Sequence, residues 1–319
     1  MHSTVSLLRA MAVAGVVAPL PLTLLAQDDD SAWNHFGLDY RIGLNVQAKF
    51  SEHPAGYING FVKPDSSGNS GATWNWGYQS AAQISGNNLL LSKASFPGSQ
   101  NDTDDPQMGF ELNYVRDLDH EDWGGWGIKF AFGYTDISVK NNGPINGSLL
   151  SDSYSLGGIT APLAPYAGSF NGPGPVISST PNGSPSSTPA TITGSRSLDA
   201  NLYELHTGPT IDWNISRRFT LEAGGGLALG IVDSTFKYNE TITSALGSTP
   251  LSGSTSDTGF DAGFYLETGL AYRLCQSTSL YGGVQYEYLD SFNQSYAGQG
   301  AELDLSASVY FVLGLEFHF

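Results

Sequence analysis

LDLSASVYFVLGLEFHF, residues Leu303 to Phe319, carries the clearest structural pattern in the chain. Apolar side chains occupy every second position of it, and the positions between them are polar or small except for Val312. Successive side chains of a strand point to opposite faces, so a period of two over this length predicts one long β-strand. A strand with one face in lipid and the other in a lumen has this pattern and this length. The alternative is a half-buried edge strand of a soluble sheet.

Seven earlier stretches alternate in the same way and are predicted to be strands. They cover residues 36–50, 108–114, 126–134, 203–213, 219–231, 260–274 and 280–288. In the first of them, Phe36 and Phe50 end an apolar row that is mostly aliphatic between them. Two aromatic girdles around a lipid band produce this arrangement. Pro209 interrupts the fourth stretch and predicts a β-bulge there, because proline donates no ladder hydrogen bond.

The connections between these stretches run long, short, long, short, long, short, long. Transmembrane barrels have an even number of antiparallel strands, joined by short turns at one end and long loops at the other. A closed barrel also leaves no unpaired backbone edge in lipid. The sequence therefore predicts an all-β fold, an antiparallel up-and-down transmembrane barrel of eight strands.

The long connections are predicted to be extracellular loops, at about residues 51–106, 141–197, 233–257 and 290–301. Prolines in the second of these loops argue against a regular sheet and indicate partial disorder. The first loop contains Trp74, Trp76 and Tyr78 at alternate positions, which we interpret as a loop that packs its own aromatic side chains. Two alternatives remain for this segment. One is an aromatic platform for a ligand, and the other is an additional membrane hairpin over residues 72–84, which makes the barrel ten-stranded.

The composition restricts the functional class. A formal net charge of −17 argues against nucleic-acid binding, which needs a basic surface. Beyond the amino-terminus, no apolar run approaches the ~18 residues that a membrane helix needs. Cys275 is the single cysteine, so an intrachain disulfide and metal sites built on several thiolates are excluded. No cofactor is predicted.

The first 26 residues are predicted to be a signal peptide for export. Arg9 precedes a short apolar core, and Ala26 offers a small residue before a cleavage site. Two prolines in the core argue against the alternative, an uncleaved membrane anchor. The predicted organisation is a signal peptide over residues 1–26 and a barrel with long loops over residues 27–319.

The alternation and the order of the connections resemble the small OmpA/OmpX-type β-barrels of the Gram-negative outer membrane. The last stretch resembles the carboxy-terminal assembly signal of such barrels, carried here by Phe311, Phe317 and Phe319. The resemblance implies an outer-membrane location, both termini in the periplasm, and contact with outer-membrane lipid and with the barrel assembly machinery. It covers the chain from residue 27 onward but includes no functional motif, so it implies little about activity.

The faces opposite the apolar rows carry most of the charged side chains of the predicted strands. The predicted lumen charge network consists of Asp39, Arg41, Lys49, Glu111, Lys129, Glu204, His206, Asp212, Glu222, Asp261, Glu267, Arg273, Glu287, Asp304 and Glu316. The lumen of an eight-stranded barrel is barely wide enough for side chains, so buried charges must pair there. We interpret this set as a structural salt-bridge plug. The alternative is that the excess of acids and the many inward glycines leave room for water and favour cations along the axis.

The sequence leaves three functions open. The first is a non-catalytic outer-membrane barrel with a structural or surface-interaction role, whose loops contact an extracellular ligand. The second is a narrow, cation-preferring, porin-like pore. The third is a lipid-modifying hydrolase built on His206 with Glu204, Asp212 and Glu222. No serine is tied to His206 by spacing, so a hydrogen-bonded lumen histidine is the better interpretation, and no catalytic or metal site is predicted.

Overall fold

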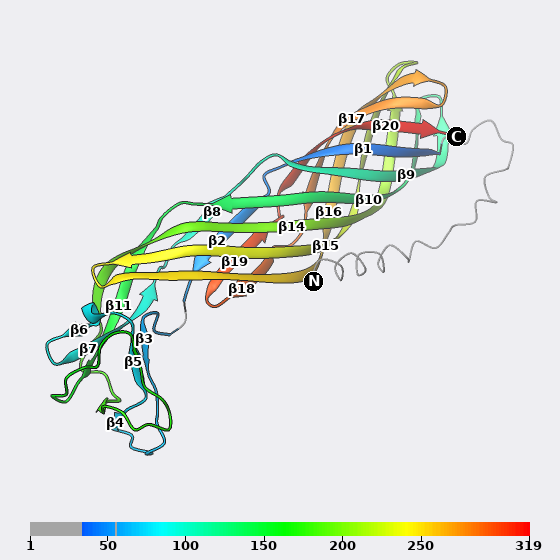
Figure 1. Ribbon diagram of the computed structural model, residues 1–319. Helices are drawn as coiled ribbons and strands as arrows, with labels where there is room; N and C mark the ends of the chain where they lie inside the picture. The colour runs from blue at the N-terminus through cyan, green and yellow to red at the C-terminus, as the bar shows by residue number, and fades with distance from the viewer. Residues whose placement is uncertain (1–33, 55) are drawn as a thin grey trace. The chain divides into compact units, whose positions relative to one another are not determined.

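Eight strands close into a ring (Figure 1). The computed structural model describes residues 34–54 and 56–319. Its main sheet has 11 strands, and eight of them form the ring because β10 also pairs with β14. The ring consists of β1 (His35–Leu44), β9 (Gln107–Glu121), β10 (Gly124–Asn141), β14 (Ser186–Asn214), β15 (Phe219–Ser244), β16 (Gly247–Cys275), β17 (Thr278–Tyr288) and β20 (Ser308–His318). Neighbouring strands are antiparallel, and β20 pairs with β1. The predicted eight-stranded barrel is confirmed, whereas the predicted signal peptide lies outside the described residues.

The outer face of the ring carries an apolar belt. The predicted outward rows are confirmed within the ring, and Leu227 and Phe260 are 64% and 65% exposed. On β14 the belt extends from Tyr203 to Trp213, with an aromatic residue at each end. Ten residues at ~3.4 Å each and a tilt of ~40° correspond to ~26 Å along the barrel axis, which is the height of a lipid hydrocarbon band.

The outer face changes from apolar to polar along one line of strand partners. Four successive partners on β10, β14, β15 and β16 end the apolar belt: Tyr134, Tyr203, Ile231 and Phe260. The next outward position on each strand is polar, and these positions are also successive partners: Asp136, Asn201, Asp233 and Thr258. We call the part of the barrel on the apolar side of this line the membrane half, and the part beyond it the extension.

The interior of the extension is largely apolar next to the membrane half, whose interior is charged. The buried residues that fill it, which we call the extension core, are Val46, Ala48, Phe50, Ile137, Val139, Leu198, Ala200, Leu202, Ala228, Val232, Phe236, Tyr238, Leu289, Phe292, Ala301, Leu303 and Leu305. The period of two continues through β14 and β15, but the apolar residues move from odd to even positions beyond Tyr203 and Ile231. One continuous strand therefore presents an apolar face to lipid and then an apolar face to a protein core.

The predicted third loop over residues 233–257 is wrong. There β15 and β16 continue as one hairpin that turns at Ala245 and Leu246. Phe236, Tyr238 and Ile242 point inward, whereas most of the positions between them are polar. The segment therefore has the composition of a loop but the period of a strand. Figure 1 shows β14 and β15 passing without a break from the ring into the extension.

The first and last predicted strands each break in two, and there the predicted faces are wrong. Asn45, with a φ of 64°, separates β1 from β2 (Gln47–Glu52), and a turn at residues 306–307 separates β19 (Gln299–Asp304) from β20. Each break shifts the alternation by one residue, and a one-residue slip exchanges the two faces of a strand. Phe50 and Leu303 therefore lie in the extension core rather than toward lipid. Lys49 and Asp304, predicted to be in the lumen, lie on the opposite face.

The other predicted long loops also contain regular strands. The predicted partial disorder of residues 141–197 is therefore wrong where β11 and the first part of β14 lie. β2, β8 (Ser99–Asp102), β18 (Phe292–Tyr296) and β19 form a four-stranded sheet. β11 (Ile145–Ser155), β7 (Asn88–Ser95) and β6 (Ile84–Ser85) extend the main sheet beyond β14. One small sheet contains β3 (Gly60–Val62), β5 (Trp76–Tyr78) and β12 (Tyr166–Ala167). Another contains β4 (Ala72–Thr73) and β13 (Ile177–Ser178). A 3-10 helix, η3 (Ala81–Gln83), precedes β6. Within the described residues, no helix has the length and apolar character needed to cross a membrane.

Two prolines lie in β14 without ending it. Pro189 has a ladder partner on one side only, Ser148 of β11, which suits a residue without an N–H. The bulge predicted at Pro209 is wrong. Pro209 is not paired with β15, but Thr207 and Thr210 on either side of it keep the same register with that strand. The ladder is interrupted there without an extra residue.

Candidate functional site

A continuous chain of charged side chains crosses the lumen of the membrane half. Arg41 on β1 is fully buried, and its guanidinium pairs with Glu204 on β14 and, at 3.1 Å, with Glu287 Oε2 on β17. His206 on β14 lies 3.3 Å from Glu287 Oε1 through Nε2 and 3.3 Å from Glu111 Oε2 through Nδ1. Two carboxylates on opposite sides therefore fix both ring nitrogens of this histidine.

Lys129 on β10 continues the chain across the lumen. Its Nζ lies 2.8 Å from Glu111 Oε1 and 2.7 Å from Glu267 Oε2 on β16. Two aromatic rings pack against the charged groups: Tyr310, whose ring centroid is 3.8 Å from the Arg41 guanidinium carbon, and Tyr265, which stacks on His206 at 4.8 Å. We call the nine residues the lumen network: Arg41, Glu111, Lys129, Glu204, His206, Tyr265, Glu267, Glu287 and Tyr310. Because they come from every ring strand except β15, the network fills the width of the lumen.

The inward glycines make room for large side chains rather than for water. A Cβ added to Gly133 would lie 2.4 Å from Arg41 Nη1, and one added to Gly269 would lie 2.4 Å from the Tyr281 ring. Side chains from other strands of the ring thus occupy the volume that each glycine leaves. The expectation that these glycines open the lumen is wrong at these positions, and the salt-bridge plug is the arrangement found.

The hydrolytic group of the third alternative is only partly brought together: Glu204 lies beside His206, but Asp212 and Glu222 do not. Asp212 and Glu222 are strand partners of each other on β14 and β15, whereas His206 is paired with Ala228. Six residues of strand, or about 20 Å, separate the two levels. His206 is the hydrogen-bonded lumen histidine that the sequence favours, and its partners are members of the lumen network.

The remaining predicted lumen charges lie outside the lumen network. Asp39 is buried on β1, and its Oδ2 accepts a hydrogen bond from Asn113 Nδ2 at 2.6 Å. Glu316 is buried on β20, whereas Asp261 and Arg273 are half-buried on β16. Asp39 and Glu316 lie toward the end of the ring at which β1 begins and β20 ends. Asp261 lies nearer the extension, because its strand partner Gly230 pairs with Glu204.

A second buried charge cluster lies in the extension, and sequence reasoning missed it. Arg196 on β14 has Nε 2.7 Å from Glu52 Oε1, pairs with Glu240 on β15, and donates through Nη1 to Asn141 Oδ1 at 2.8 Å. Burial, together with the neighbouring Glu52 carboxylate, raises the pKa of Glu240. A sequence signal existed, because Arg196 shares its even-numbered face with Leu198, but this segment was predicted to be a loop.

Two groups in the described part of the chain have the composition of a metal site. Glu204, His206 and Glu287 place one ligand atom each within 4.8 Å of one another. Arg41 pairs with both of these glutamates, so a metal ion would have to displace a buried guanidinium. The second group contains His35, Glu222 and Glu316, at the end of the ring away from the extension.

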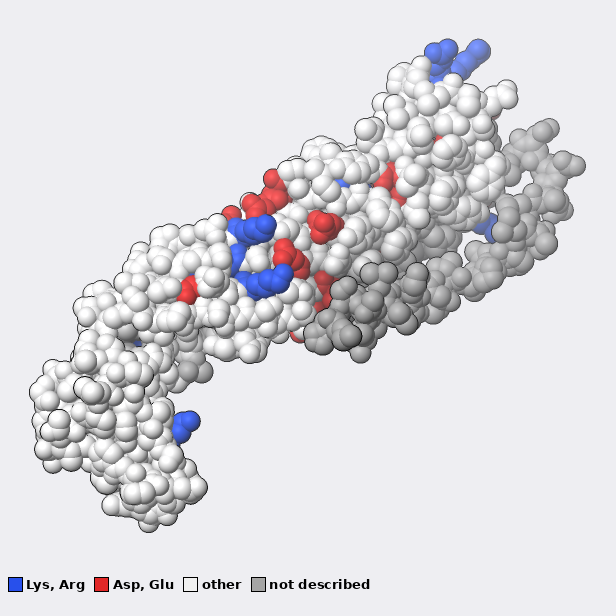
Figure 2. All heavy atoms as spheres, in the orientation of Figure 1, with Lys and Arg blue, Asp and Glu red and all other residues white. Residues whose placement is uncertain are grey.

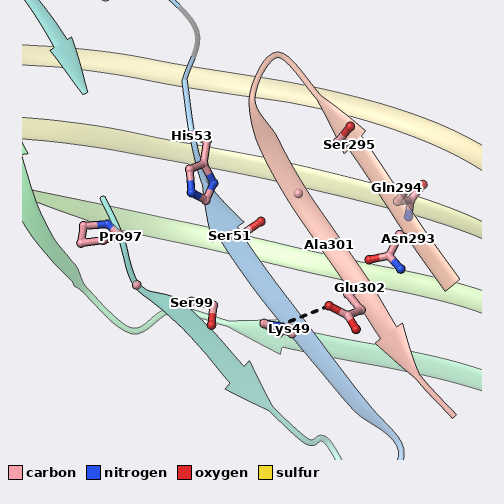
Figure 3. Close-up of a pocket in the computed structure, with 12 residues that line it drawn as sticks. Lys49, Ser51, His53, Pro97, Ser99, Asn293, Gln294, Ser295, Ala301 and Glu302 are labelled. Carbon is pink, nitrogen blue, oxygen red and sulfur yellow. Dashed lines mark ion pairs between the residues drawn. The ribbon is translucent and has the colours of Figure 1, made fainter. Parts of the chain in front are cut away.

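A polar groove lies over the four-stranded sheet of the extension (Figure 3). Its volume is about 500 Å³, and its lining includes Lys49, Ser51, Ser99, Asn293 and Glu302. Lys49 Nζ lies 3.5 Å from Glu302 Oε2, which is the ion pair drawn in Figure 3. Hydroxyl, amide and charged groups dominate this lining, so the groove suits a polar ligand rather than an apolar one.

The aromatic residues of the first long connection form a core of their own. Trp76 is fully buried, stacks on Tyr78 with ring centroids 5.9 Å apart, and contacts Tyr166 at 4.7 Å. Trp74 is half-buried and donates to a backbone carbonyl through its indole nitrogen. The interpretation of a self-packed segment is confirmed. The ten-stranded alternative is wrong because β5 pairs with β3 and β12 outside the ring, and Trp76 and Tyr78 are too buried to serve as a ligand platform.

Charge is unevenly distributed on the surface. Figure 2 shows most of the visible Lys, Arg, Asp and Glu side chains in one band partway along the strands, with largely uncharged surface on either side of it. Phe311, Phe317 and Phe319 are exposed in the outer row at the end of the chain. Their role as an assembly signal stays a prediction.

A closed ring with an apolar outer belt and an ion-paired interior satisfies the backbone and side-chain requirements for crossing a bilayer. The protein is a small β-barrel of the outer-membrane type. This assignment rests on the ring, its belt and its lumen.

No protein-family model and no characterised protein sequence matches the barrel. Among solved structures, the outer-membrane protease OmpT of Escherichia coli is similar over 92% of this chain and 100% of its own, with 12% identity and a TM-score of 0.36. The attachment invasion locus protein Ail of Yersinia pestis is similar over 90% and 99%, with 12% identity and a TM-score of 0.31. OprG of Pseudomonas aeruginosa is similar over 89% and 96%, with 12% identity and a TM-score of 0.31. At these identities and TM-scores, the likenesses have no weight in assigning a function.

Proposed function

We propose that the protein is a non-conducting, non-catalytic outer-membrane barrel that holds the extension outside the cell as a rigid surface for contact with partners. In this proposal the short turns and both termini are periplasmic. Support for the orientation comes from the connections, because the strands of the ring are joined by short turns at one end and by the extension at the other. Short turns in such barrels face the periplasm.

The observation that carries this proposal is that two obstructions follow one another inside the barrel. The lumen network fills the membrane half with paired charges, and the extension core continues the interior with apolar side chains that are at most 8% exposed. A pore needs a continuous path lined by water or by groups that replace ion hydration. An apolar core in series with a paired plug supplies neither, so the pore alternative loses its physical basis.

Planar-bilayer recording tests the proposal. The refolded full chain should give no steady conductance steps in bilayers in which a porin gives its usual steps. Heat-modifiable gel mobility of the same sample shows that the barrel is folded. Reproducible cation-selective steps from a folded sample would overturn the non-conducting proposal and restore the pore.

The non-catalytic part of the proposal is supported by the environment of His206. Carboxylates flank both ring nitrogens, and the side chain is closed off from solvent. A general base needs access to the proton that it removes from a substrate or nucleophile. Hydrolysis of outer-membrane lipid by the folded barrel, lost in His206→Ala, would contradict this part.

The groove over the four-stranded sheet is the surface we propose for an extracellular ligand. Its chemistry suits a hydroxyl-rich ligand such as a polysaccharide, because the lining contains hydroxyl, amide and charged side chains that donate and accept hydrogen bonds. Ser99→Trp would fill the groove from an exposed position on β8. Binding of the folded barrel to an oligosaccharide array should fall in this variant and persist in Asn239→Ala, an exposed position on β15. Equal binding by both variants would place the contact surface elsewhere.

A further inference from the structure

The group of His35, Glu222 and Glu316 lies where the ring closes. His35 begins β1, Glu316 lies near the end of β20, and these two strands are the first and last of the ring. Glu222 belongs to β15, which is not adjacent to either strand. The three side chains nevertheless place one ligand atom each within 4.8 Å of one another. They therefore meet across the lumen rather than along one strand.

Two buried carboxylates at this end of the lumen each keep one oxygen without a hydrogen-bond partner. Glu316 is 3% exposed and its carboxyl group lies at hydrogen-bond distance from Glu222, but its Oε2 has no partner among the described residues. Asp39 is also buried, and its Oδ1 likewise has no hydrogen-bond partner among the described residues. Lys129 is already held between Glu111 and Glu267. Buried carboxylate oxygens without a partner indicate that a cation or a proton belongs at this place.

We propose that His35, Glu222 and Glu316 bind one divalent transition-metal ion, with Zn²⁺ as the best match. One imidazole nitrogen and two carboxylate oxygens from three chain segments are a ligand set that Zn²⁺ accepts, whereas Ca²⁺ and Mg²⁺ prefer oxygen alone. His318 is the strand partner of His35, with ring centroids 5.3 Å apart. We do not assign it as a ligand, because only His35, Glu222 and Glu316 place ligand atoms within 4.8 Å of one another, and its Nε2 lies 2.9 Å from Ser279 Oγ.

A metal ion at this place would connect the first and last strands of the ring with a strand on the far side of the lumen. It binds only when the ring is closed, because the unfolded chain does not bring the three ligands together. An ion that binds the folded state alone raises its stability. The bound protein should therefore resist thermal unfolding more than the metal-free protein.

Titration of the folded, chelator-treated full chain without a histidine tag tests the site. Calorimetry with ZnCl₂ in detergent should show one Zn²⁺ per chain, with at least tenfold weaker binding in Glu316→Gln, Glu222→Gln and His35→Ala. Glu302→Gln, in an exposed ion pair, and His53→Ala, in the groove, are matched controls that should bind as the parent does. Heat-modifiable mobility of each variant confirms that it is folded.

The temperature at which the heat-modifiable band shifts gives a second readout. Zn²⁺ should raise it in the parent and in the two controls, but not in Glu316→Gln. Absence of stoichiometric Zn²⁺ binding by the folded parent would overturn the proposal and leave a shared proton as the partner of the carboxylates. Binding that survives Glu316→Gln and disappears in His53→Ala would overturn it as well.

Discussion

The membrane half and the extension are made of the same strands but follow opposite rules of burial. On β14, Glu204 and His206 point into the barrel and Leu205 points outward, whereas a few residues earlier Leu198 points inward and Asp199 outward. Alternation shows only that the two faces of a strand differ. The medium on each side decides which face is apolar. The phase of the alternation, rather than its presence, therefore marks where the membrane ends.

The interior of the membrane half can be tested by removing its central cation. Arg41→Ala leaves Glu204 and Glu287 buried without that cation and should lower the free energy of unfolding by about 3–5 kcal/mol. Urea unfolding in lipid vesicles, followed by tryptophan fluorescence, measures the change. Arg217→Ala, in an exposed turn, is the control and should change it by less than about 0.5 kcal/mol. Equal small effects would mean that the lumen is hydrated.

The interior of the extension should respond to a cavity instead of a charge. Leu198→Ala removes a fully buried side chain from the extension core and should destabilise the extension by about 2–5 kcal/mol. Hydrogen exchange should speed up at the backbone amides of the extension and remain slow in the membrane half. Asn239→Ala is the exposed control on β15. Uniform loss of protection over both halves would show that they unfold as one unit.

The line between the halves is sharpened by placing one charge on each side of it. Leu227 and Asn239 lie on the same outer face of β15, on the membrane and extension sides of the line. Leu227→Arg should cost about 2–4 kcal/mol, because it puts a charge near the middle of the lipid band. Asn239→Arg should cost less than about 0.5 kcal/mol. Similar costs in the same urea assay would remove the proposed line.

The pH dependence of the extension follows from the cluster of Arg196, Glu52 and Glu240. Burial raises the pKa of Glu240, so the folded extension keeps a proton that the unfolded chain releases above its ordinary pKa of 4.5. Between that value and the raised one, stability must fall as pH rises, by at most about 1.4 kcal/mol per pH unit. Hydrogen exchange from pH 5 to 8, corrected for the intrinsic rate, measures this fall. Glu240→Gln should flatten it, and an unchanged slope would exclude Glu240 as its source.

The outer face of the extension should contribute least. Lys49 and Glu302 form an exposed ion pair at 3.5 Å, and a double-mutant cycle with Lys49→Met and Glu302→Gln should give about 0.2–1 kcal/mol. Raising the salt concentration should reduce this coupling. A coupling of several kcal/mol, insensitive to salt, would mean that this face is covered rather than solvated.

The number of ring strands, the outward rows of the membrane half and most residues of the lumen network could be predicted from the sequence. These follow from local alternation, because a strand in a barrel must have one apolar and one polar face over the height of the bilayer. The change from odd to even apolar positions beyond Tyr203 is also visible in the sequence, at Leu202, Ala200 and Leu198. Serine, threonine and glycine around these positions favoured a loop, so the extension was predicted wrongly.

Which side chains meet could not be predicted from the sequence, because it depends on how the ring closes. Arg41 and Glu204 are 163 residues apart in sequence and become partners through the register of the closed ring. Asn45 shifts the alternation by one residue, which sends Phe50 into the extension core and Lys49 to the surface. Closure also fills the space beside Gly133 and Gly269 with side chains from other strands. Period and composition act within one segment, whereas partner choice and packing depend on segments that only the closed ring brings together.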